Sequence, residues 1–239
     1  MTTIENQLSN LRFHGMYARW KAMVETREHH GLSFNEGLEV LLQAEEQDRA
    51  NRRFERLVKM AQFRYQASIE ELNLESGRGI NTSQITELAT GTYLNQGECI
   101  LITGATGCGK SFLASALGHQ ACGQGKTVLY FNTQKLLMKT KMARIDGSFL
   151  KLFAKLAKAD LLILDDFGLA HLDKKQQMDL MEIIEDRHAK ASTIIASQLP
   201  VGSWYDIIGE MTIADAILDR LVHTSHRIEL KGESLRKKL

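Results

Sequence analysis

The stretch Cys99-Ile-Leu-Ile-Thr-Gly-Ala-Thr-Gly-Cys-Gly-Lys-Ser-Phe-Leu-Ala114 decides the fold of this chain. It begins with an apolar run typical of a buried strand, and its end continues into a helical segment, Phe112 to Ala121. Between them, Gly104 to Ser111 matches the phosphate-loop pattern G-x-x-x-x-G-K-[ST]. Because strand, loop and helix follow in the required order, we favour a nucleotide-binding loop over a glycine-rich turn with a chance lysine.

The chemistry of such a loop predicts a role for each position. Glycines let consecutive backbone N–H groups point at phosphate oxygens, and the N-terminus of the following helix adds partial positive charge. Lys110 is expected to reach the β- and γ-phosphates, and the Ser111 hydroxyl is expected to bind Mg²⁺. We therefore assign ATP contacts to Gly104, Ala105, Thr106, Gly107, Cys108, Gly109, Lys110, Ser111 and Phe112, with Cys108 as a small filler.

A second apolar run, Leu161-Leu-Ile-Leu-Asp165-Asp166, ends in two carboxylates. Beside a phosphate loop, this is the place where a Walker-B strand supplies its acids. Asp165 is expected to hold Mg²⁺, and Asp166 to orient the attacking water as a general base. The alternative is an exposed strand end with solvated acids. Most hydrolytic relatives of this type have glutamate at the second position, so the shorter Asp166 leaves the hydrolysis rate open.

A third strand is expected to end in Ala196-Ser197-Gln198, between the two strand ends described above. A polar side chain at this place could donate a hydrogen bond to the γ-phosphate or contact the water. Gln198 is the first candidate for this catalytic role and Ser197 the second. The alternative is a plain strand terminus.

The chain as a whole divides into a helical part and an α/β part. Up to about Glu75, apolar residues recur at helical spacing without strand-like alternation. The polar, glycine-containing stretch Glu75 to Ser83 is typical of a connector, so we predict an all-α domain over residues 1–76 and an ATPase domain over 77–239. Beyond it, continuous apolar runs predict a mostly parallel sheet flanked by helices, with strands at Cys99–Thr103, Thr127–Phe131, Leu161–Leu164, Thr193–Ala196 and His226–Leu230.

The composition is that of an ordinary globular protein. The chain has 239 residues, 44% of them hydrophobic, and 30 lysines and arginines against 29 acids give a net charge of +1. This balance gives no general argument for or against a nucleic-acid partner, so any such surface must be local. No stretch approaches the roughly 20 apolar residues of a membrane span, and three scattered cysteines fit a reducing compartment. We expect a cytoplasmic protein without a membrane partner.

Four motifs carry a resemblance to a known family, and the last two of them are much more specific than the phosphate loop. Gly107-Cys-Gly-Lys-Ser-Phe-Leu-Ala114, Asp160-Leu-Leu-Ile-Leu-Asp-Asp-Phe-Gly168, Ala216-Ile-Leu-Asp-Arg-Leu221 and Gly232-Glu-Ser-Leu-Arg236 together resemble the IstB-like helper ATPases of insertion sequences. These belong to the AAA+ superfamily and are related to the helicase loader DnaC. The resemblance covers most of the chain. It implies an ATP-dependent homo-oligomer that binds duplex DNA, marks an insertion site and stimulates a partner transposase.

The resemblance also implies that an arginine of one subunit completes the neighbour's ATP site. Arg220 matches the position of this finger and is assigned a catalytic role; a local ion pair on its own helix is the alternative, and Arg187 is the second candidate. Such a head-to-tail contact produces rings or helical filaments. Arg236 matches the terminal motif, but the chain leaves no room for the helical lid usual in AAA+ proteins.

Two basic segments are candidates for DNA contacts. Related loaders and initiators carry a DNA-binding helix after the second strand, where this chain has Lys135, Lys139, Lys141 and Arg144. Lysines at such loose spacing can reach backbone phosphates, although an ordinary solvated helix face would look the same. The second segment could hold DNA or the acidic face of a neighbouring subunit, and it comprises Arg49, Arg52, Arg53 and Arg56.

Two other functions compete with a transposition helper. A helicase-loader adaptor would use its helical N-terminal domain to bind a replicative helicase, but the Gly232 to Arg236 motif favours the helper. A small-molecule kinase would also need a phosphate loop. The acidic pair Asp165 and Asp166, together with the candidate finger Arg220, argues against it.

Overall fold

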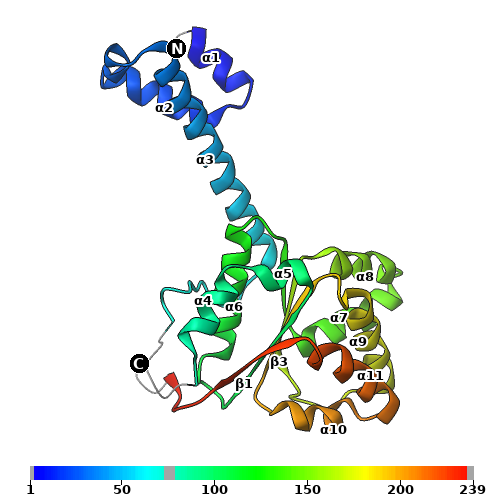
Figure 1. Ribbon diagram of the computed structural model, residues 1–239. Coiled ribbons are helices and arrows are strands. Elements are labelled where there is room, and N and C mark those ends of the chain that lie inside the picture. Colours follow the sequence, from blue (N-terminus) through cyan, green and yellow to red (C-terminus); the bar gives the residue numbers. More distant parts are fainter. Residues whose placement is uncertain (1–2, 73–78, 236–239) are drawn as a thin grey trace. The chain divides into compact units, whose positions relative to one another are not determined.

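The computed structural model describes residues 3–72 and 79–235, and the chain forms two compact units, Met1–Arg56 and Leu57–Leu239 (Figure 1). The division lies inside one long helix, earlier than the predicted boundary at residues 76 and 77. The reason is that Leu57 and Ala61, near the end of this helix, are already buried in the core of the second unit. Of the predicted connector, residues 75–78 lie outside the described residues. Asn81 caps the next helix by accepting a hydrogen bond from Ser83 N.

The first unit is helical, as predicted, with α1 (Thr3–Asn10), α2 (His14–Glu25), the 3₁₀ helix η1 (Glu28–Gly31) and most of α3 (Phe34–Ala61). Its packing depends on Gly15, since a Cβ at this position would lie 2.3 Å from the carbonyl oxygen of Ala44. The close approach lets the buried Glu45 carboxylate accept hydrogen bonds from the N–H groups of Gly15 (2.8 Å) and Met16 (3.2 Å). Glu45 therefore ties α3 to the first turn of α2, where the helix dipole favours a negative charge.

The second unit contains a five-stranded parallel sheet in the order β2-β3-β4-β1-β5. All five strands lie where the apolar runs predicted them, and no strand end differs by more than three residues. Because the strands are parallel, their carboxyl ends meet at one edge of the sheet. The bounds are β1 (Cys99–Gly104), β2 (Val128–Asn132), β3 (Leu161–Phe167), β4 (Ser192–Ser197) and β5 (Ser225–Leu230).

Helices cover both faces of this sheet (Figure 1). One face packs against the end of α3 and against α4 (Thr82–Ala89), α5 (Thr92–Gln96) and α6 (Lys110–Gly123). The other face carries α7 (Thr133–Ile145), α8 (Phe149–Lys158), α9 (Lys174–Arg187), α10 (Trp204–Ile208) and α11 (Met211–Val222), with η2 (Val201–Ser203) before α10. Among the described residues, no helix is long and apolar enough to cross a membrane.

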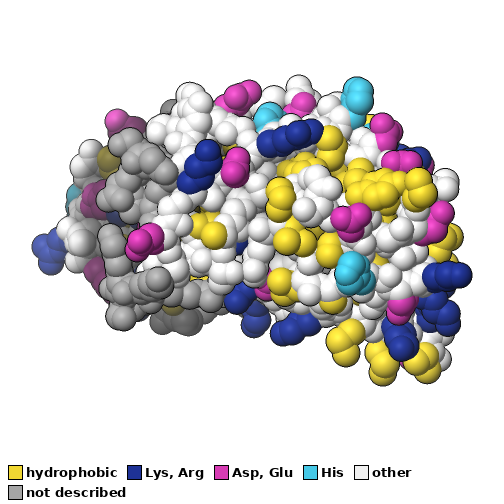
Figure 2. Space-filling model, turned by 90° about the horizontal axis from the view of Figure 1, so that it is seen from below, with side chains coloured by type: hydrophobic (Ala, Val, Ile, Leu, Met, Phe, Trp, Pro, Cys, Tyr) yellow, Lys and Arg dark blue, Asp and Glu magenta, His cyan; other side chains and the backbone are white. Residues whose placement is uncertain are grey.

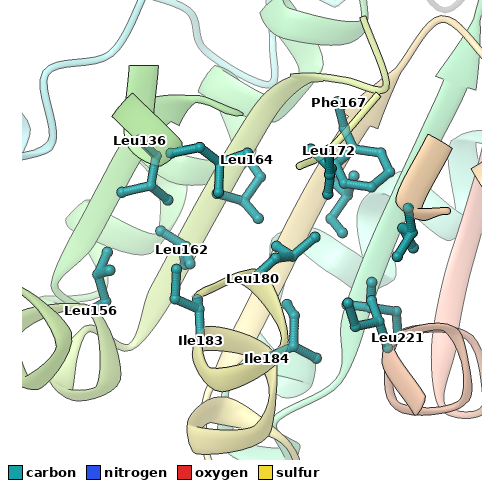
Figure 3. Packing of buried hydrophobic residues seen from close by; sticks show 14 of the residues in the cluster. Leu136, Leu156, Leu162, Leu164, Phe167, Leu172, Leu180, Ile183, Ile184 and Leu221 are labelled. Atoms are coloured by element: carbon teal, nitrogen blue, oxygen red, sulfur yellow. The ribbon is translucent and has the colours of Figure 1, made fainter. Parts of the chain in front are cut away.

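Successive residues of each strand serve opposite faces, so the sheet separates two cores. On β3, Leu162 and Leu164 point towards α9 and its neighbours (Figure 3), whereas Ile163 packs on the side of α6. All three side chains are fully buried, and each contributes about 1.5–3 kcal/mol through loss of apolar surface from water. This burial on both faces explains why the strands are continuous apolar runs.

The sheet ends close to the described C-terminal end of the chain. β5 stops at Leu230, and residues 231–235 complete the described part. Arg236 lies outside the described residues.

Candidate nucleotide site

The phosphate loop connects β1 to α6 and has the strand, loop and helix context that the sequence predicted. Gly104 and Gly107 have φ angles of 144° and 83°, which favour glycine. At Gly107 a side chain is also excluded by space, because a Cβ would lie 2.1 Å from Ser234 Oγ. Leu235 N donates a hydrogen bond of 3.0 Å to Gly107 O. The C-terminal motif therefore packs directly on the loop, a contact that the sequence did not reveal.

Lys110 is folded over this loop. Its side chain is 7% exposed, and its ammonium donates hydrogen bonds to the carbonyl oxygens of Gly104 (2.8 Å) and Ala105 (2.7 Å). The cation is thereby held against the loop. Cys108 is buried beside it, as expected of a small filler. A phosphate on the loop N–H groups could replace carbonyl oxygens as the partner of the ammonium.

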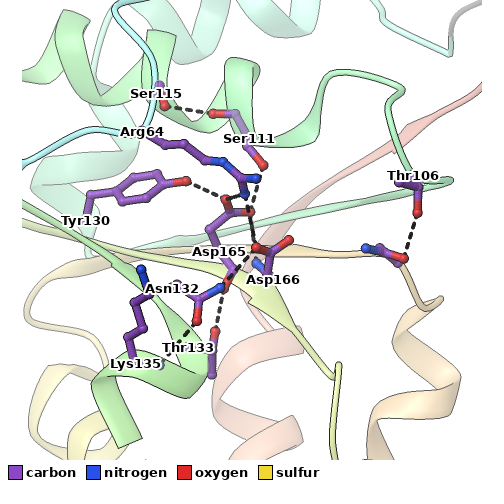
Figure 4. A network of polar contacts seen from close by, with 11 residues as sticks. Arg64, Thr106, Ser111, Ser115, Tyr130, Asn132, Thr133, Lys135, Asp165 and Asp166 are labelled. Carbon is purple, nitrogen blue, oxygen red and sulfur yellow. Dashed lines mark hydrogen bonds and ion pairs between the residues drawn. The ribbon is translucent and has the colours of Figure 1, made fainter. Parts of the chain in front are cut away.

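Asp165 lies at the carboxyl end of β3 and is 1% exposed (Figure 4). Its Oδ1 accepts hydrogen bonds from Ser111 Oγ (3.0 Å) and from Asp166 N (2.9 Å). Its Oδ2 accepts one from the hydroxyl of Tyr130, a residue of β2. Burial and this bond to Asp165 raise the pKa of Tyr130, so the phenol keeps its proton as a donor. Asp165 is thus a buried carboxylate aligned by several donors.

The pair Ser111 and Asp165 has the chemistry of a Mg²⁺ site. A hydroxyl that donates its proton to a carboxylate keeps its lone pairs for a cation, and Mg²⁺ prefers oxygen ligands. Ser111 also lines the nucleotide cavity. The side chains present therefore fit the ion that the sequence predicted.

Asp166 has a left-handed backbone, with φ of 55°, and the pairing of β3 with β4 is irregular between Leu164 and Phe167. The irregularity allows two successive acids to serve one site, where a regular strand would turn them to opposite faces. Asp166 Oδ2 accepts hydrogen bonds of 3.0 Å from Asn132 Nδ2 and from Arg64 Nη1. The candidate general base is therefore held by two donors.

The start of α7 is linked to both acids. Asn132 caps this helix, since its Oδ1 accepts a hydrogen bond of 3.2 Å from Lys135 N while its Nδ2 binds Asp166. The neighbouring Thr133 Oγ1 donates a 2.8 Å hydrogen bond to the main-chain oxygen of Asp165. The first turn of α7 and the end of β3 thus form one hydrogen-bonded network (Figure 4).

The two polar candidates at the end of β4 differ in placement. Gln198 Oε1 accepts a 2.8 Å hydrogen bond from Thr106 Oγ1 of the phosphate loop, and Gln198 lines the cavity. Ser197 is fully buried and donates to the main-chain oxygen of Phe167 at 2.8 Å, so the second candidate supports the turn and is not among the residues that line the cavity.

These elements enclose a cavity of about 490 Å³, lined among others by Arg64, Thr106, Lys110, Ser111, Asp166 and Gln198. The structure therefore brings together the phosphate loop, one acid and the strand-end glutamine that were assigned from separate motifs. Phe112 is also in the wall, near the ring of Tyr65 at a centroid distance of 6.2 Å. A second cavity of about 470 Å³ lies on the β2 side of the acids and is lined by Arg64, Asn132, Lys135, Asp165 and Asp166, among others.

The two arginine-finger candidates are in different environments. Arg220, on α11, is partly exposed and forms a 2.5 Å ion pair with Glu185 of α9, so its local partner is neither of the acids on its own helix. Arg187 is 1% exposed, and its guanidinium donates to the main-chain oxygens of Leu156, Ala159 and Ser192. Burial lowers the pKa of Arg187 to about 10. Arg187 holds the protein core together and does not fit the role of second candidate.

The basic residues of α7 are not equivalent. Lys135, Lys139 and Lys141 are exposed along the helix. Arg144 instead bonds the buried carboxylate of Asp179 (Nε to Oδ1, 3.2 Å) and lies 3.7 Å above the ring of Phe149. Arg144 is therefore paired within the protein, although its side chain is 42% exposed. Lys139 lies 5.7 Å from the ring centroid of Phe131 and stays exposed, as do Lys135 and Lys141.

The second basic segment lies in the first unit. Arg49 and Arg52 form ion pairs with acids of their own helix, Glu45 and Asp48. Together with Arg12 they line a surface depression of about 260 Å³ that also includes Arg53 and Arg56. The guanidinium groups thus gather at one place, which suits an anionic ligand.

Four residues of the nucleotide site were missed in the sequence: Arg64, Tyr130, Asn132 and Thr133. The last three occupy the end of β2 and the start of α7, so the neighbouring strand end was the available signal. Arg64 lies 102 residues before Asp166, and no local pattern indicates its contact.

Comparison with known proteins agrees with these features. A family described as IstB-like ATP binding protein matches residues 6–239. A relative from Sinorhizobium fredii (strain NBRC 101917 / NGR234), named as an insertion-sequence ATP-binding protein, is 41% identical over 97% of this chain and 95% of its own length. Another from Pseudomonas fluorescens, named in the same way, is 44% identical over 82% of this chain and 85% of its own length.

Solved structures show the same fold at low sequence identity. The DnaI structure has a TM-score of 0.59 at 17% identity and covers 71% of this chain and 90% of its own. The DnaC helicase loader has a TM-score of 0.53 at 21% identity, over 66% of this chain and 96% of its own. These likenesses confirm the predicted α/β fold, a parallel sheet flanked by helices, and nothing beyond the fold.

Proposed function

Because this chain belongs to the family of IstB-like ATP-binding proteins, as its motifs predicted, we propose that it is the ATPase that assists transposition of an insertion sequence. It binds ATP with Mg²⁺, assembles head to tail on duplex DNA and stimulates a partner transposase. Hydrolysis then switches the assembly off. The observation that carries this proposal is the convergence of Lys110, Ser111, Asp166 and Gln198 on one cavity.

ATP binding uses the loop N–H groups and the Lys110 ammonium for the phosphates. Ser111 and Asp165 would hold Mg²⁺, which when bound neutralises phosphate charge. Gln198 is placed to contact the γ-phosphate or the attacking water, because it lies in the cavity wall and is already bonded to the loop through Thr106. Residues of the phosphate loop, of the end of β3 and of the end of β4 would thus bind the triphosphate and its Mg²⁺.

Hydrolysis depends on Asp166 as the general base. In the structure its Oδ2 is occupied by Asn132 and Arg64. These two donors occupy the oxygen that would accept the proton of the attacking water. The active state therefore requires at least one of these donors to leave, which makes turnover dependent on a change at the site.

Assembly in a head-to-tail manner would place Arg220 of one subunit at the neighbour's γ-phosphate, where a guanidinium stabilises the charge of the transition state. Arg220 does not line the cavity of its own chain, and its ion pair with Glu185 is partly exposed. Figure 2 shows hydrophobic side chains grouped among charged ones on one face. Exposed apolar residues of this unit, such as Leu169, Met178 and Met211, suit a surface covered by another subunit.

Duplex DNA is the proposed ligand of the exposed lysines of α7. They carry no acidic neighbour on the helix, and their spacing suits phosphate oxygens of the backbone, so binding is expected to be largely independent of sequence and weaker at high salt. The arginine depression of the first unit is a second place for DNA or for an acidic surface of a neighbour.

A helicase-loader adaptor remains the second candidate, because the fold is shared with DnaC and DnaI. The relatives named as insertion-sequence proteins, which match almost the whole chain, favour a transposase partner. Pull-down of the purified chain with ATP against a transposase and a replicative helicase separates the two. Retention of the helicase alone would reject the transposition role.

The direct test of the proposed assembly is electron microscopy of the full chain with duplex DNA and a non-hydrolysable ATP analogue. Rings or filaments on the duplex are expected with the analogue and not without nucleotide. Lys141→Glu with Lys139→Glu should reduce DNA coverage, whereas Lys158→Glu, at the exposed end of α8, should not. Discrete monomers on bare duplex under all conditions would contradict the proposal.

A further inference from the structure

Arg64 places a second cation in the nucleotide cavity. Among the described residues that line the cavity, Arg64 and Lys110 are the basic ones. The Arg64 Nη1 atom lies 3.0 Å from Asp166 Oδ2 and 3.3 Å from Asp165 Oδ2, so one nitrogen contacts both acids (Figure 4). Arg64 also lines the second cavity on the β2 side. The guanidinium therefore contacts both acids and also lines the space that a nucleotide would fill.

The backbone beside Arg64 is anchored in the core, whereas its side chain is held, among the described residues, only by the two acids and by the ring of Tyr65, whose centroid lies 5.6 Å away. Phe63 packs over Gly118 so closely that a Cβ there would lie 2.4 Å from the Phe63 ring, and it also stacks near His119 at 4.5 Å. In contrast, the Arg64 side chain is 41% exposed. A long, exposed side chain on a fixed backbone can change partners without any rearrangement of the core.

Neither acid depends on Arg64 alone. Without it, Asp165 keeps its hydrogen bonds from Ser111, Tyr130 and the backbone, and Asp166 keeps Asn132. Departure of the guanidinium therefore leaves neither carboxylate without a hydrogen-bond donor.

A triphosphate offers this guanidinium a better partner. The planar fork of an arginine binds phosphate oxygens through two parallel hydrogen bonds, whereas here one nitrogen is shared by two carboxylates. Because Arg64 is beside the acids that serve the terminal phosphate, the phosphate within its reach is the γ-phosphate. ADP lacks this group.

We propose that the Arg64 guanidinium binds the γ-phosphate of the ATP molecule held by its own subunit. Without nucleotide, it neutralises Asp165 and Asp166. When ATP occupies the cavity, the guanidinium moves to the γ-phosphate and releases Asp166 to orient water. Arg64 is thus the residue that distinguishes ATP from ADP, and the inference rests on the proposed function of the cavity as an ATP site.

The test is a comparison of dissociation constants for a non-hydrolysable ATP analogue and for ADP, both with Mg²⁺, on the full chain. Arg64→Ala is expected to weaken binding of the analogue about tenfold or more and to change ADP binding little, since a charge-assisted hydrogen bond of about 1.5–3 kcal/mol is lost only for the γ-phosphate. Arg64→Lys should restore part of the affinity for the ATP analogue relative to ADP. Arg227→Ala, which removes an exposed arginine of β5, is the matched control and should behave as the wild type.

An equal loss of affinity for both nucleotides in Arg64→Ala would overturn the inference, and so would unchanged affinities. Tighter binding of the analogue by Arg64→Ala would also overturn it, because Arg64 would then only block the site. If Arg64→Ala does not fold, as judged by thermal unfolding without nucleotide, Arg64→Gln takes its place with the same expectation. Failure of the wild type to bind either nucleotide would instead reject the proposed function. In crystals with the analogue, Arg64 still bonded to both acids would contradict the exchange of partners.

Discussion

Asn132 Nδ2 donates a 3.0 Å hydrogen bond to Asp166 Oδ2, and the same side chain caps α7 through its Oδ1. One amide thus joins the candidate general base to the helix that carries the exposed lysines. If α7 shifts when DNA binds, the Asn132 side chain would transmit the shift to Asp166. The structure therefore offers a physical route by which duplex DNA could control hydrolysis, and Asn132 is the place to test it.

Replacing Asn132 by Ala should raise ATP turnover without DNA and reduce its stimulation by DNA, because Asp166 loses one of the donors that restrain it. The lost helix cap is expected to cost about 1 kcal/mol of stability. Asn132→Asp keeps the cap acceptor but places a negative charge against Asp166. It therefore separates loss of the helix cap from loss of the hydrogen bond to Asp166. The measurement is the steady-state ATPase rate with and without duplex, and an unchanged ratio of the two rates would show that Asn132 carries no signal.

Asp166→Asn should preserve ATP binding and slow turnover by about 10²-fold or more, since an amide cannot accept the proton of the attacking water. The variant should also stay on duplex DNA longer after ATP is added, because hydrolysis is the proposed release step. Single-turnover hydrolysis and DNA dissociation rates test both parts. A wild-type rate of hydrolysis in this variant would remove Asp166 from the catalytic group.

Arg220→Ala subunits should bind ATP but not hydrolyse it. Mixed with Lys110→Ala subunits, which have an intact finger and a defective loop, they should regain part of the activity, because one productive site can form from two different subunits. Activity is measured across mixing ratios at fixed total protein. The absence of any recovery, with both variants assembling normally, would argue against a finger acting in trans.

Glu45→Gln should destabilise the first unit by about 1–3 kcal/mol, because a buried carboxylate bonded to two N–H groups and to Arg49 is replaced by a neutral amide. Although burial opposes ionisation, the hydrogen bonds from Arg49, Met16 and Gly15 hold the pKa of Glu45 below its usual value of 4.5. The stabilisation is therefore present above the unfolded-state pKa and is lost as the pH falls through the lower folded-state pKa.

Chemical denaturation of the first unit at several pH values checks this expectation. The difference between wild type and Glu45→Gln should shrink in acid. Glu46→Gln, which changes an exposed acid next in sequence, is the control and should remain close to the wild type at every pH. Equal stability of Glu45→Gln and wild type at neutral pH would show that the contact with α2 is dispensable.

The sequence predicted the sheet and the phosphate loop closely, because both depend on local patterns. Strands such as β3 are buried on both faces, so their sequences are continuous apolar runs. The phosphate loop has a fixed spacing of glycines before Lys110. The predicted boundary between the units was displaced because α3 runs from one unit into the other. The sequence pattern indicates where a helix ends. It does not indicate in which of two hydrophobic cores the residues of each helical turn are buried.

The contacts that control the site could not be predicted in this way. Arg64 and Asn132 reach Asp166 across 102 and 34 residues of sequence, and only the assembled sheet brings them together. Likewise, Arg187 was the second candidate for the arginine finger, yet it is buried and donates to three main-chain oxygens and to Thr193 Oγ1. Long-range polar contacts leave little trace in one sequence, because the same residue types are common on solvated surfaces.

The most direct test of the account is calorimetric titration of the purified full chain with ATP and Mg²⁺, using the wild type, Lys110→Ala and Lys158→Ala. The account predicts saturable binding by the wild type and by Lys158→Ala, an exposed lysine far in sequence from the loop, and no measurable binding by Lys110→Ala. ATP binding by Lys110→Ala with wild-type affinity, or no binding by the wild type, would contradict it.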